Sequence, residues 1–186
     1  MIKGGSSNRL RTLARAAALA AAASLAAPAH AQPSEAAVKA AFLPKFAAYA
    51  AWPASMRPQA GAPLNLCVVG GDPFGRMIDE AARGQQVDGH PIVVRRMGAA
   101  DGAGGCHIAF VQGPTPKATA AMLAMLADRP VLTVTDARAG PQRGMIYFVV
   151  EGGRVRFHID QAAAQRAGVA LNARLLAIAL SVRTGR

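Results

Sequence analysis

The feature that most limits the fold of this chain is a short apolar run that ends in two glycines, at residues 64–75 (LNLCVVGGDPFG). Its first half is almost entirely apolar, which is typical of a strand buried on both faces in a parallel sheet. Gly70 and Gly71 follow where the chain must turn, and Pro73 stands where a helix could begin. The run therefore predicts a strand, a glycine turn and a helix, the first βα unit of an α/β domain.

Further apolar runs of strand length follow, separated by helical patterns or by turn residues. They span residues 91–97, 106–111, 131–135, 145–150 and 155–160. Strands that alternate with helices predict a parallel sheet, and the Gly152-Gly153 pair between the last two runs indicates an antiparallel hairpin. The predicted fold class is α/β, a three-layer sandwich with a mostly parallel sheet, helices on both faces and a late antiparallel hairpin.

Helices are predicted before the first strand and after the last one. Ser34 is expected to cap the first helix, whose apolar face runs to about residue 51. Pro44 lies inside that helix and is expected to kink it or split it, because proline lacks the backbone N–H. Asn172 is expected to cap the last helix, with apolar residues that include Ile178 on its buried side.

The first 31 residues have the pattern of a secretory signal peptide. A basic start is followed by a small, apolar run at residues 16–27 that is too short to span a membrane comfortably. Ala29 and Ala31 fit the small-x-small cleavage rule, which predicts a signal peptide at residues 1–31 and one domain at residues 32–186. The alternative is an uncleaved amphipathic N-terminus. A leader rich in Ala and Arg points to a bacterial periplasmic protein.

The chain is basic, but its basic residues form no tract. The formal net charge is +11, and the leader carries four of these positive charges, so about +7 remains in the predicted domain. A nucleic-acid site would need a basic cluster with interleaved aromatics, and none is present, so nucleic acid is not predicted as a partner. The charge serves solubility and favours acidic partners or the membrane surface.

Cys67 and Cys106 are the only cysteines of the chain. In an oxidising compartment two cysteines predict one disulfide; the alternative is two buried free thiols. The bond would close a loop of about 40 residues, worth roughly 4 kcal/mol by chain-entropy arithmetic. If it forms, the first and third strands are neighbours. The second strand, with Arg95 and Arg96, then lies outside them in a flavodoxin-like order.

In an open α/β sheet, ligands bind at the carboxyl ends of the strands. The candidate residues for a ligand or partner edge, including two from the hairpin and the cap of the last helix, are Gly71, Asp72, Phe74, Asp136, Arg156, His158 and Asn172. Asp72 would repel phosphate, so we expect it to cap the following helix instead. Arg156 and His158 share one face of a strand; they either bind an anion or lie on an exposed sheet face.

The sequence contains no recognisable catalytic or cofactor pattern. None of the serines of the predicted domain, Ser34, Ser55 and Ser181, lies in a G-x-S-x-G elbow, and no pair of carboxylates is placed for acid–base chemistry. Only His107 lies beside a cysteine, so no metal site is predicted. We therefore predict no catalytic residue, no cofactor and no metal.

Several segments match one known family in both order and spacing. They are VKAAFL and WP at 38–43 and 52–53, LCVVGGDPFG at 66–75, CHIAFV at 106–111, PVLTVTD at 130–136, GMIYFV at 144–149, GRVRFHID at 153–160 and LNARLL at 171–176. Taken together, these segments resemble the YfiR family of periplasmic proteins, over residues 35–182. The chain departs from the family pattern at Pro44, at the His158-Ile159-Asp160 segment, and in lacking a second cysteine pair.

The resemblance implies a non-enzymatic regulator. Such a protein would bind the periplasmic part of an inner-membrane diguanylate cyclase and keep cyclic-di-GMP and biofilm formation low. Release would follow sequestration at the outer membrane, by a lipoprotein, or redox misfolding. The resemblance also implies a homodimer and a disulfide between Cys67 and Cys106. Related domains occur beside sensor kinases and outer-membrane receptors, so the alternative is a periplasmic small-molecule sensor. A hydrolase, the remaining rival, lacks a nucleophile.

Overall fold

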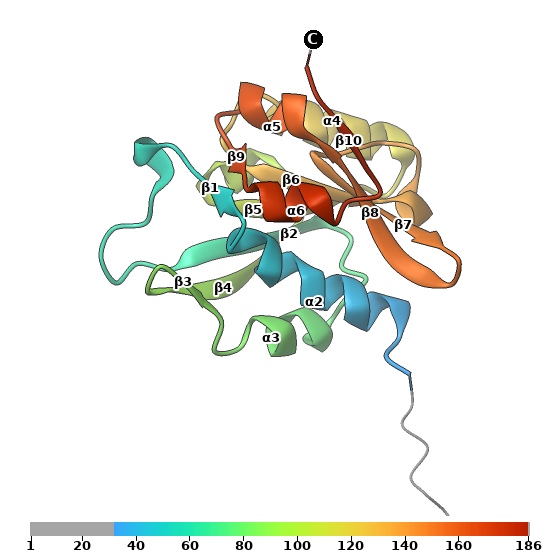
Figure 1. Cartoon of the computed structure of the whole chain (residues 1–186), viewed down its shortest axis with the longest axis horizontal. Helices are drawn as coiled ribbons and strands as arrows, with labels where there is room; N and C mark the ends of the chain where they lie inside the picture. Colours follow the sequence, from blue (N-terminus) through green and yellow to red (C-terminus); the bar gives the residue numbers. More distant parts are fainter. Residues whose placement is uncertain (1–31, 186) are drawn as a thin grey trace, which may run out of the picture. The chain divides into compact units, whose positions relative to one another are not determined.

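A mixed sheet of eight strands forms the centre of the protein (Figure 1). The computed structural model describes residues 32–185. The strands are β1 (Ala50–Ala51), β2 (Leu64–Gly70), β3 (Gln86–Val87), β4 (His90–Met97), β5 (Ile108–Gln112), β6 (Leu132–Asp136), β7 (Ile146–Glu151), β8 (Arg154–Asp160), β9 (Ala170–Leu171) and β10 (Ser181–Arg183). The α-helices are α2 (Glu35–Ala47), α3 (Arg76–Ala82), α4 (Pro116–Leu126), α5 (Gln161–Arg166) and α6 (Ala173–Ala177). Short 3-10 turns are η2 (Ala54–Met56), η3 (Asp101–Gly105) and η4 (Ala137–Ala139).

The strand order in the large sheet is β10-β8-β7-β6-β5-β2-β4-β3. Strands β4, β2, β5, β6 and β7 run parallel to one another, whereas β3 pairs antiparallel with β4, and β7 and β8 form the antiparallel hairpin. The small strands β1 and β9 pair separately. The predicted α/β class, the late hairpin and the flavodoxin-like placement of β2 between β4 and β5 are all confirmed.

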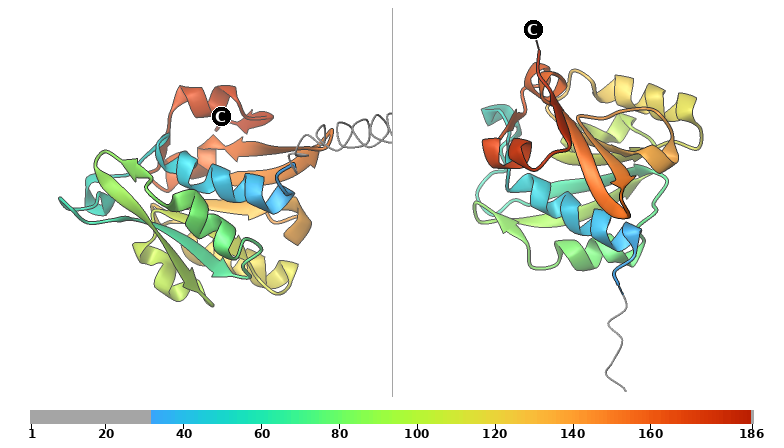
Figure 2. Two further views of the ribbon diagram at one scale, coloured as in Figure 1. Left: turned by 90° about the horizontal axis from the view of Figure 1, so that it is seen from below. Right: turned by 45° about the vertical axis from the view of Figure 1, so that its right-hand side comes forward.

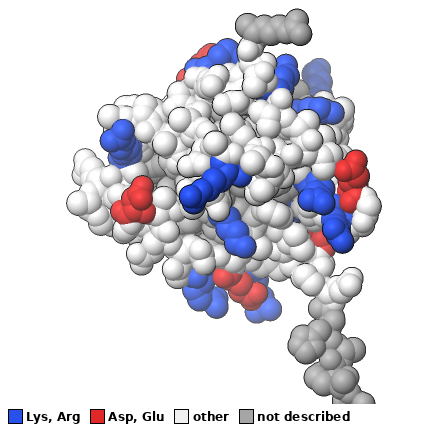
Figure 3. All heavy atoms as spheres, in the orientation of Figure 1, with Lys and Arg blue, Asp and Glu red and all other residues white. Residues whose placement is uncertain are grey.

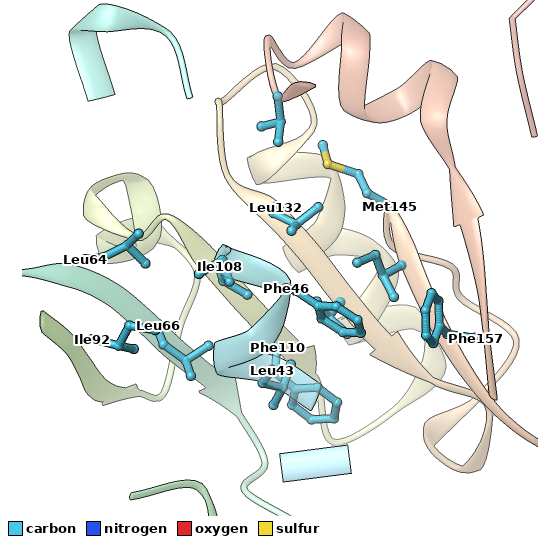
Figure 4. Close-up of a cluster of buried hydrophobic side chains, with 14 of the residues drawn as sticks. Leu43, Phe46, Leu64, Leu66, Ile92, Ile108, Phe110, Leu132, Met145 and Phe157 are labelled. Atoms are coloured by element: carbon cyan, nitrogen blue, oxygen red, sulfur yellow. The ribbon is translucent and has the colours of Figure 1, made fainter. Parts of the chain in front are cut away.

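Helices cover the two faces of the sheet unequally. On one face, α2, α3, α5 and α6 pack over the larger core, and α2 and α3 run side by side (Figure 2). In that core Phe46 of α2 lies against Phe157 of the hairpin (Figure 4), with the ring centroids 5.3 Å apart. The ring of Phe148, on the other strand of the hairpin, lies 5.7 Å from that of Phe46. On the other face α4 covers a smaller core around β2 and β5.

The first helix is continuous through its proline. The Ser34 hydroxyl accepts a hydrogen bond from the Ala37 N–H at 3.2 Å, which confirms the predicted cap. Pro44 lies in the last turn of α2, so its missing N–H removes only one late helical bond. Of the two predicted outcomes, a kink or a split, the split is wrong, because α2 continues through Pro44 to Ala47. The helix also ends earlier than predicted, at Ala47, because Ala50–Ala51 pair with β9.

The turn after β2 differs in detail from its prediction. Helix α3 begins at Arg76 with Gly75 as its N-cap, so neither Pro73 nor Asp72 takes the predicted helical position. The Asp72 carboxylate instead accepts hydrogen bonds from the N–H groups of Phe74 at 2.8 Å and Gly75 at 3.0 Å. Asp72 therefore closes the turn itself rather than capping the helix that follows it.

The end of the chain also differs from its prediction. Asn172 caps α6 as expected, with its side chain accepting from the Arg174 N–H at 2.9 Å. The helix ends at Ala177, however, and Ile178 is 57% exposed rather than buried. Residues Ser181–Arg183 form β10, which pairs in parallel with β8 and supplies an edge strand that the sequence did not predict.

The predicted signal peptide, residues 1–31, lies outside the described residues, so its cleavage and the domain boundary stay predictions. Within residues 32–185, no helix has both the length and the apolar character needed to cross a bilayer.

Candidate functional site

A pocket of about 420 Å³ lies where β5 and β6 end, beside the start of α2. Its lining residues are Glu35, Ala36, Lys39, Pro73, Phe74, Gln112, Asp136, Arg138 and Ala139. We call it the strand-end pocket. It occupies the edge at which ligands bind in open parallel sheets, and two predicted edge residues, Phe74 and Asp136, line it.

The innermost charge of the strand-end pocket belongs to Lys39, which is only 2% exposed. Its ammonium donates to Asp136 Oδ2 at 2.5 Å and also to Glu35 one helical turn earlier. A buried ammonium is tolerated only when it is paired, and here two carboxylates share it. Lys39 therefore ties the first helix to the end of β6.

Arg138 completes this charge network from the rim of the pocket. Its guanidinium binds both oxygens of Glu35, with Nε 2.7 Å from Oε1 and an Nη2 nitrogen 2.5 Å from Oε2. The Arg138 backbone N–H donates to Asp136 Oδ1 at 3.0 Å. The hydrogen bond from Arg138 outweighs burial and, with Lys39, lowers the pKa of Glu35, while Glu35 raises the pKa of Arg138.

The two cations and two carboxylates of this network compensate one another. With Phe74 buried on its wall against Phe110, at a ring-centroid distance of 4.7 Å, the pocket combines an apolar surface with paired charges. Such a lining suits the binding of a small polar molecule.

A second ion-pair network lies beside the predicted edge residues Gly71 and Asp72. Arg96 of β4 donates to Asp72 Oδ2 at 2.7 Å and holds both oxygens of Asp79 at 3.0 and 2.7 Å. Desolvation alone would raise the pKa of Asp72, but the hydrogen bonds from Arg96 and from the turn lower it below its usual range. The hydrogen bond from Arg96 likewise lowers the pKa of Asp79. These residues fix the first βα turn.

The remaining predicted edge residues do not join the strand-end pocket. Arg156 and His158 project from the outward face of β8, and Asn172 caps α6. His158 shares a 2.7 Å hydrogen bond with the Ser181 hydroxyl of β10 and stacks on Tyr147. The predicted edge thus divides into the strand-end region and a separate hairpin face.

Sequence reasoning missed Glu35, Lys39 and Arg138 as pocket residues. The signal available was a lysine within an apolar helical stripe, four residues after an acid. Nothing local, however, connects Lys39 to Asp136 or Arg138 to Glu35.

The predicted disulfide joins Cys67 of β2 to Cys106 just before β5. Both residues are buried in the smaller core. Next to it, the His107 ring accepts at Nδ1 from the Asn65 N–H at 3.0 Å and contacts the Met56 carbonyl through Nε2 at 2.8 Å. Desolvation lowers the pKa of His107, so the neutral ring is favoured.

No group of three or more potential His, Cys, Asp or Glu metal ligands is found among residues 32–185. Figure 3 shows Lys and Arg side chains spread over the face in view with acidic side chains among them, rather than gathered in one tract.

The chain was compared with models of known protein families. A family model described as YfiR/HmsC-like matches residues 36–180. A search among curated proteins found no match.

Proposed function

The chain belongs to the YfiR/HmsC-like family, and from this membership we propose that it holds a membrane signalling protein inactive by binding to it. The family comprises periplasmic regulators of cyclic-di-GMP signalling. The extent of the match carries the proposal, because residues 36–180 include both helical layers and the central strands rather than a single motif.

The proposed partner is the periplasmic domain of an inner-membrane diguanylate cyclase, and a sensor kinase is the alternative partner. A repressor shifts an equilibrium only by binding one state more tightly than the other. Binding to the inactive cyclase would therefore keep cyclic-di-GMP and biofilm formation low. We further propose that the repressor acts as a homodimer and that an outer-membrane lipoprotein can sequester it.

Deletion of the gene tests this function directly. We expect cyclic-di-GMP to rise in the deletion strain and to return to its original level when the wild-type gene is restored. Deleting the cyclase gene as well should remove the rise, which separates an effect through that enzyme from a general stress response. Unchanged cyclic-di-GMP in the single deletion would contradict the proposal.

A small-molecule sensor is the second candidate function, and the strand-end pocket supports it. The pocket has a volume of about 420 Å³ and carries the buried Lys39 on its wall. If the protein senses a metabolite there, a library of small polar molecules should contain at least one that raises its melting temperature. The shift should disappear in a Phe74→Ala variant. A library without any stabilising compound would count against this function.

A further inference from the structure

The outward side of the β7–β8 hairpin and of the edge strand β10 is basic, and no helix within residues 32–185 covers it. We call this surface the outer hairpin face; its defining residues are Arg143, Tyr147, Arg154, Arg156, His158 and Arg183. We propose that it docks an acidic, extended segment of the membrane partner. This inference rests on the proposed function and adds to it the location of the contact and the chemistry of the partner.

The alternation of β8 separates a buried side from an outward one. Phe157 and Ile159 are 3% and 2% exposed and belong to the larger core, whereas Arg154 and Arg156, which precede them on the alternate positions of the strand, are exposed. On the outward side of the sheet α4 packs against β5, so it leaves the hairpin open. The outward positions of β8 and β10 carry Arg154, Arg156 and Arg183, with Asp160 as the one acidic residue among them.

The charges of the outer hairpin face are only partly balanced. Asp160 is paired with Arg183, and Glu151 lies opposite Arg154 at the tip of the hairpin. Neither Arg154 nor Arg156 makes an ion pair within the part of the chain that the structure describes. Their guanidinium groups therefore remain available to an incoming carboxylate, which they can bind through two parallel hydrogen bonds.

A hollow of about 340 Å³ lies on the same face towards the other end of β8, between Arg143 and Arg183, and Asp160, the ion-pair partner of Arg183, also lines it. Tyr147 and His158 line it, and the Arg143 guanidinium lies 4.8 Å from the centre of the Tyr147 ring. A depression with aromatic walls and cations on both sides can receive one side chain of a bound segment. It gives the surface a shape as well as a charge.

The spacing along β8 favours an extended peptide as the occupant. Outward residues two positions apart on a strand are separated by about 7 Å, since a strand rises 3.2–3.4 Å per residue. Alternate side chains of an extended peptide repeat at the same distance. Carboxylates at every second position of a partner segment would therefore face Arg154 and Arg156 in turn.

A binding measurement with defined peptides tests the docking surface. The probe is a fluorescein-labelled peptide of alternating Glu and Ser, compared with one of alternating Gln and Ser, in fluorescence anisotropy at low salt. The wild-type protein should bind only the acidic peptide. Binding should weaken at least tenfold in the R154E/R156E variant and persist in R76E/R83E, which makes the same charge change on the opposite side of the sheet.

Three results would overturn the inference. The first is that R154E/R156E binds the acidic peptide as tightly as the wild-type protein does. The second is that the wild-type protein does not bind the acidic peptide. The third is that the wild-type protein binds phosphatidylglycerol vesicles instead of the peptide. Thermal melting of both variants checks that they fold. If R154E/R156E melts early, R154Q/R156Q replaces it, because glutamine adds no repulsion between neighbours.

A complementation experiment separates this inference from the proposed function. In the deletion strain, wild type and R76E/R83E should restore low cyclic-di-GMP, and R154E/R156E should not. If deletion leaves cyclic-di-GMP unchanged, the proposed function fails, whereas the peptide measurement still decides the surface. If deletion raises cyclic-di-GMP and R154E/R156E fully restores the low level, the proposed function stands and the docking surface fails.

Discussion

Lys39 and Asp136 lie 97 residues apart in the chain and form an ion pair of 2.5 Å. Their side chains are only 3% and 9% exposed. The pair fastens the first helix to the end of the fourth parallel strand of the sheet, at the place where the strand-end pocket opens. Because the interaction is largely removed from water, neither charge can be left alone without cost.

We therefore expect Lys39→Met to lower the free energy of unfolding by about 3 kcal/mol, since it leaves the Asp136 carboxylate buried without its cation. Urea unfolding measures the change. Lys45→Met, on the exposed side of the same helix, is the matched control and should change stability by less than about 0.5 kcal/mol.

A second variant tests whether the loss comes from the unpaired charge. Lys39→Met combined with Asp136→Asn should be less destabilised than the sum of the two single variants, because the double change removes both charges. Equal effects of Lys39→Met and Lys45→Met would show that the buried pair does not contribute to stability.

The central part of the fold could be predicted because its signals are local. The apolar run before Gly70 and the Gly152-Gly153 pair mark strands and turns within a few residues. The two cysteines added one long-range constraint, which placed β2 beside β5. The edge strand β10 could not be predicted, because Ser181–Arg183 becomes a strand only through pairing with β8.

The location of the strand-end pocket could be predicted from the sequence, but the ion-pair network that lines it could not. The rule for parallel sheets pointed to the edge that contains Asp136. The contacts of Glu35 depend instead on how α2 lies over the sheet, since its partner Arg138 is 103 residues away. A single sequence does not show how α2 lies over the sheet. The structure does, through the burial of Lys39 beneath that helix.

The disulfide should be a main source of stability. We expect Cys67→Ala/Cys106→Ala to lower the free energy of unfolding by about 4 kcal/mol at most, because the denatured chain gains the freedom of a loop of about 40 residues. Thermal melting with and without dithiothreitol measures this. Reductant should lower the melting temperature of the wild-type protein to that of the double variant and leave the melting temperature of that variant unchanged. If melting is insensitive to both changes, the bond has no stabilising role.

His107 should make stability depend on pH. Burial lowers the pKa of His107 in the folded protein, so below the unfolded value of about 6.5 the unfolded chain binds a proton that the folded protein does not. Stability is therefore complete above that pH and falls as the pH decreases towards the folded pKa, by up to about 1.4 kcal/mol per pH unit. Carboxylates with lowered pKa values, such as Glu35 and Asp72, also stabilise the folded protein, and that stability is lost only at more acidic pH.

Urea unfolding of wild type and His107→Asn between pH 7 and 5 measures this dependence. Asparagine can accept the Asn65 N–H in place of Nδ1, but it does not titrate, so its stability should fall less steeply over this range. Parallel curves for the two proteins would contradict the assignment of the effect to His107.

Gly70 is expected to tolerate no side chain. Its φ is +84°, and a Cβ built there would lie 2.2 Å from the Gln112 carbonyl oxygen of the neighbouring strand β5. Gly84 has a similar φ of +72° but has nothing within 4 Å of such a Cβ. Gly84→Ala should therefore lower the free energy of unfolding by about 1–2 kcal/mol, the cost of the left-handed backbone alone. Gly70→Ala should cost clearly more, because β2 and β5 must also separate, and chemical unfolding of the two variants compares them. Equal losses would mean that backbone conformation alone, and not the close contact with β5, requires the glycine at the end of β2.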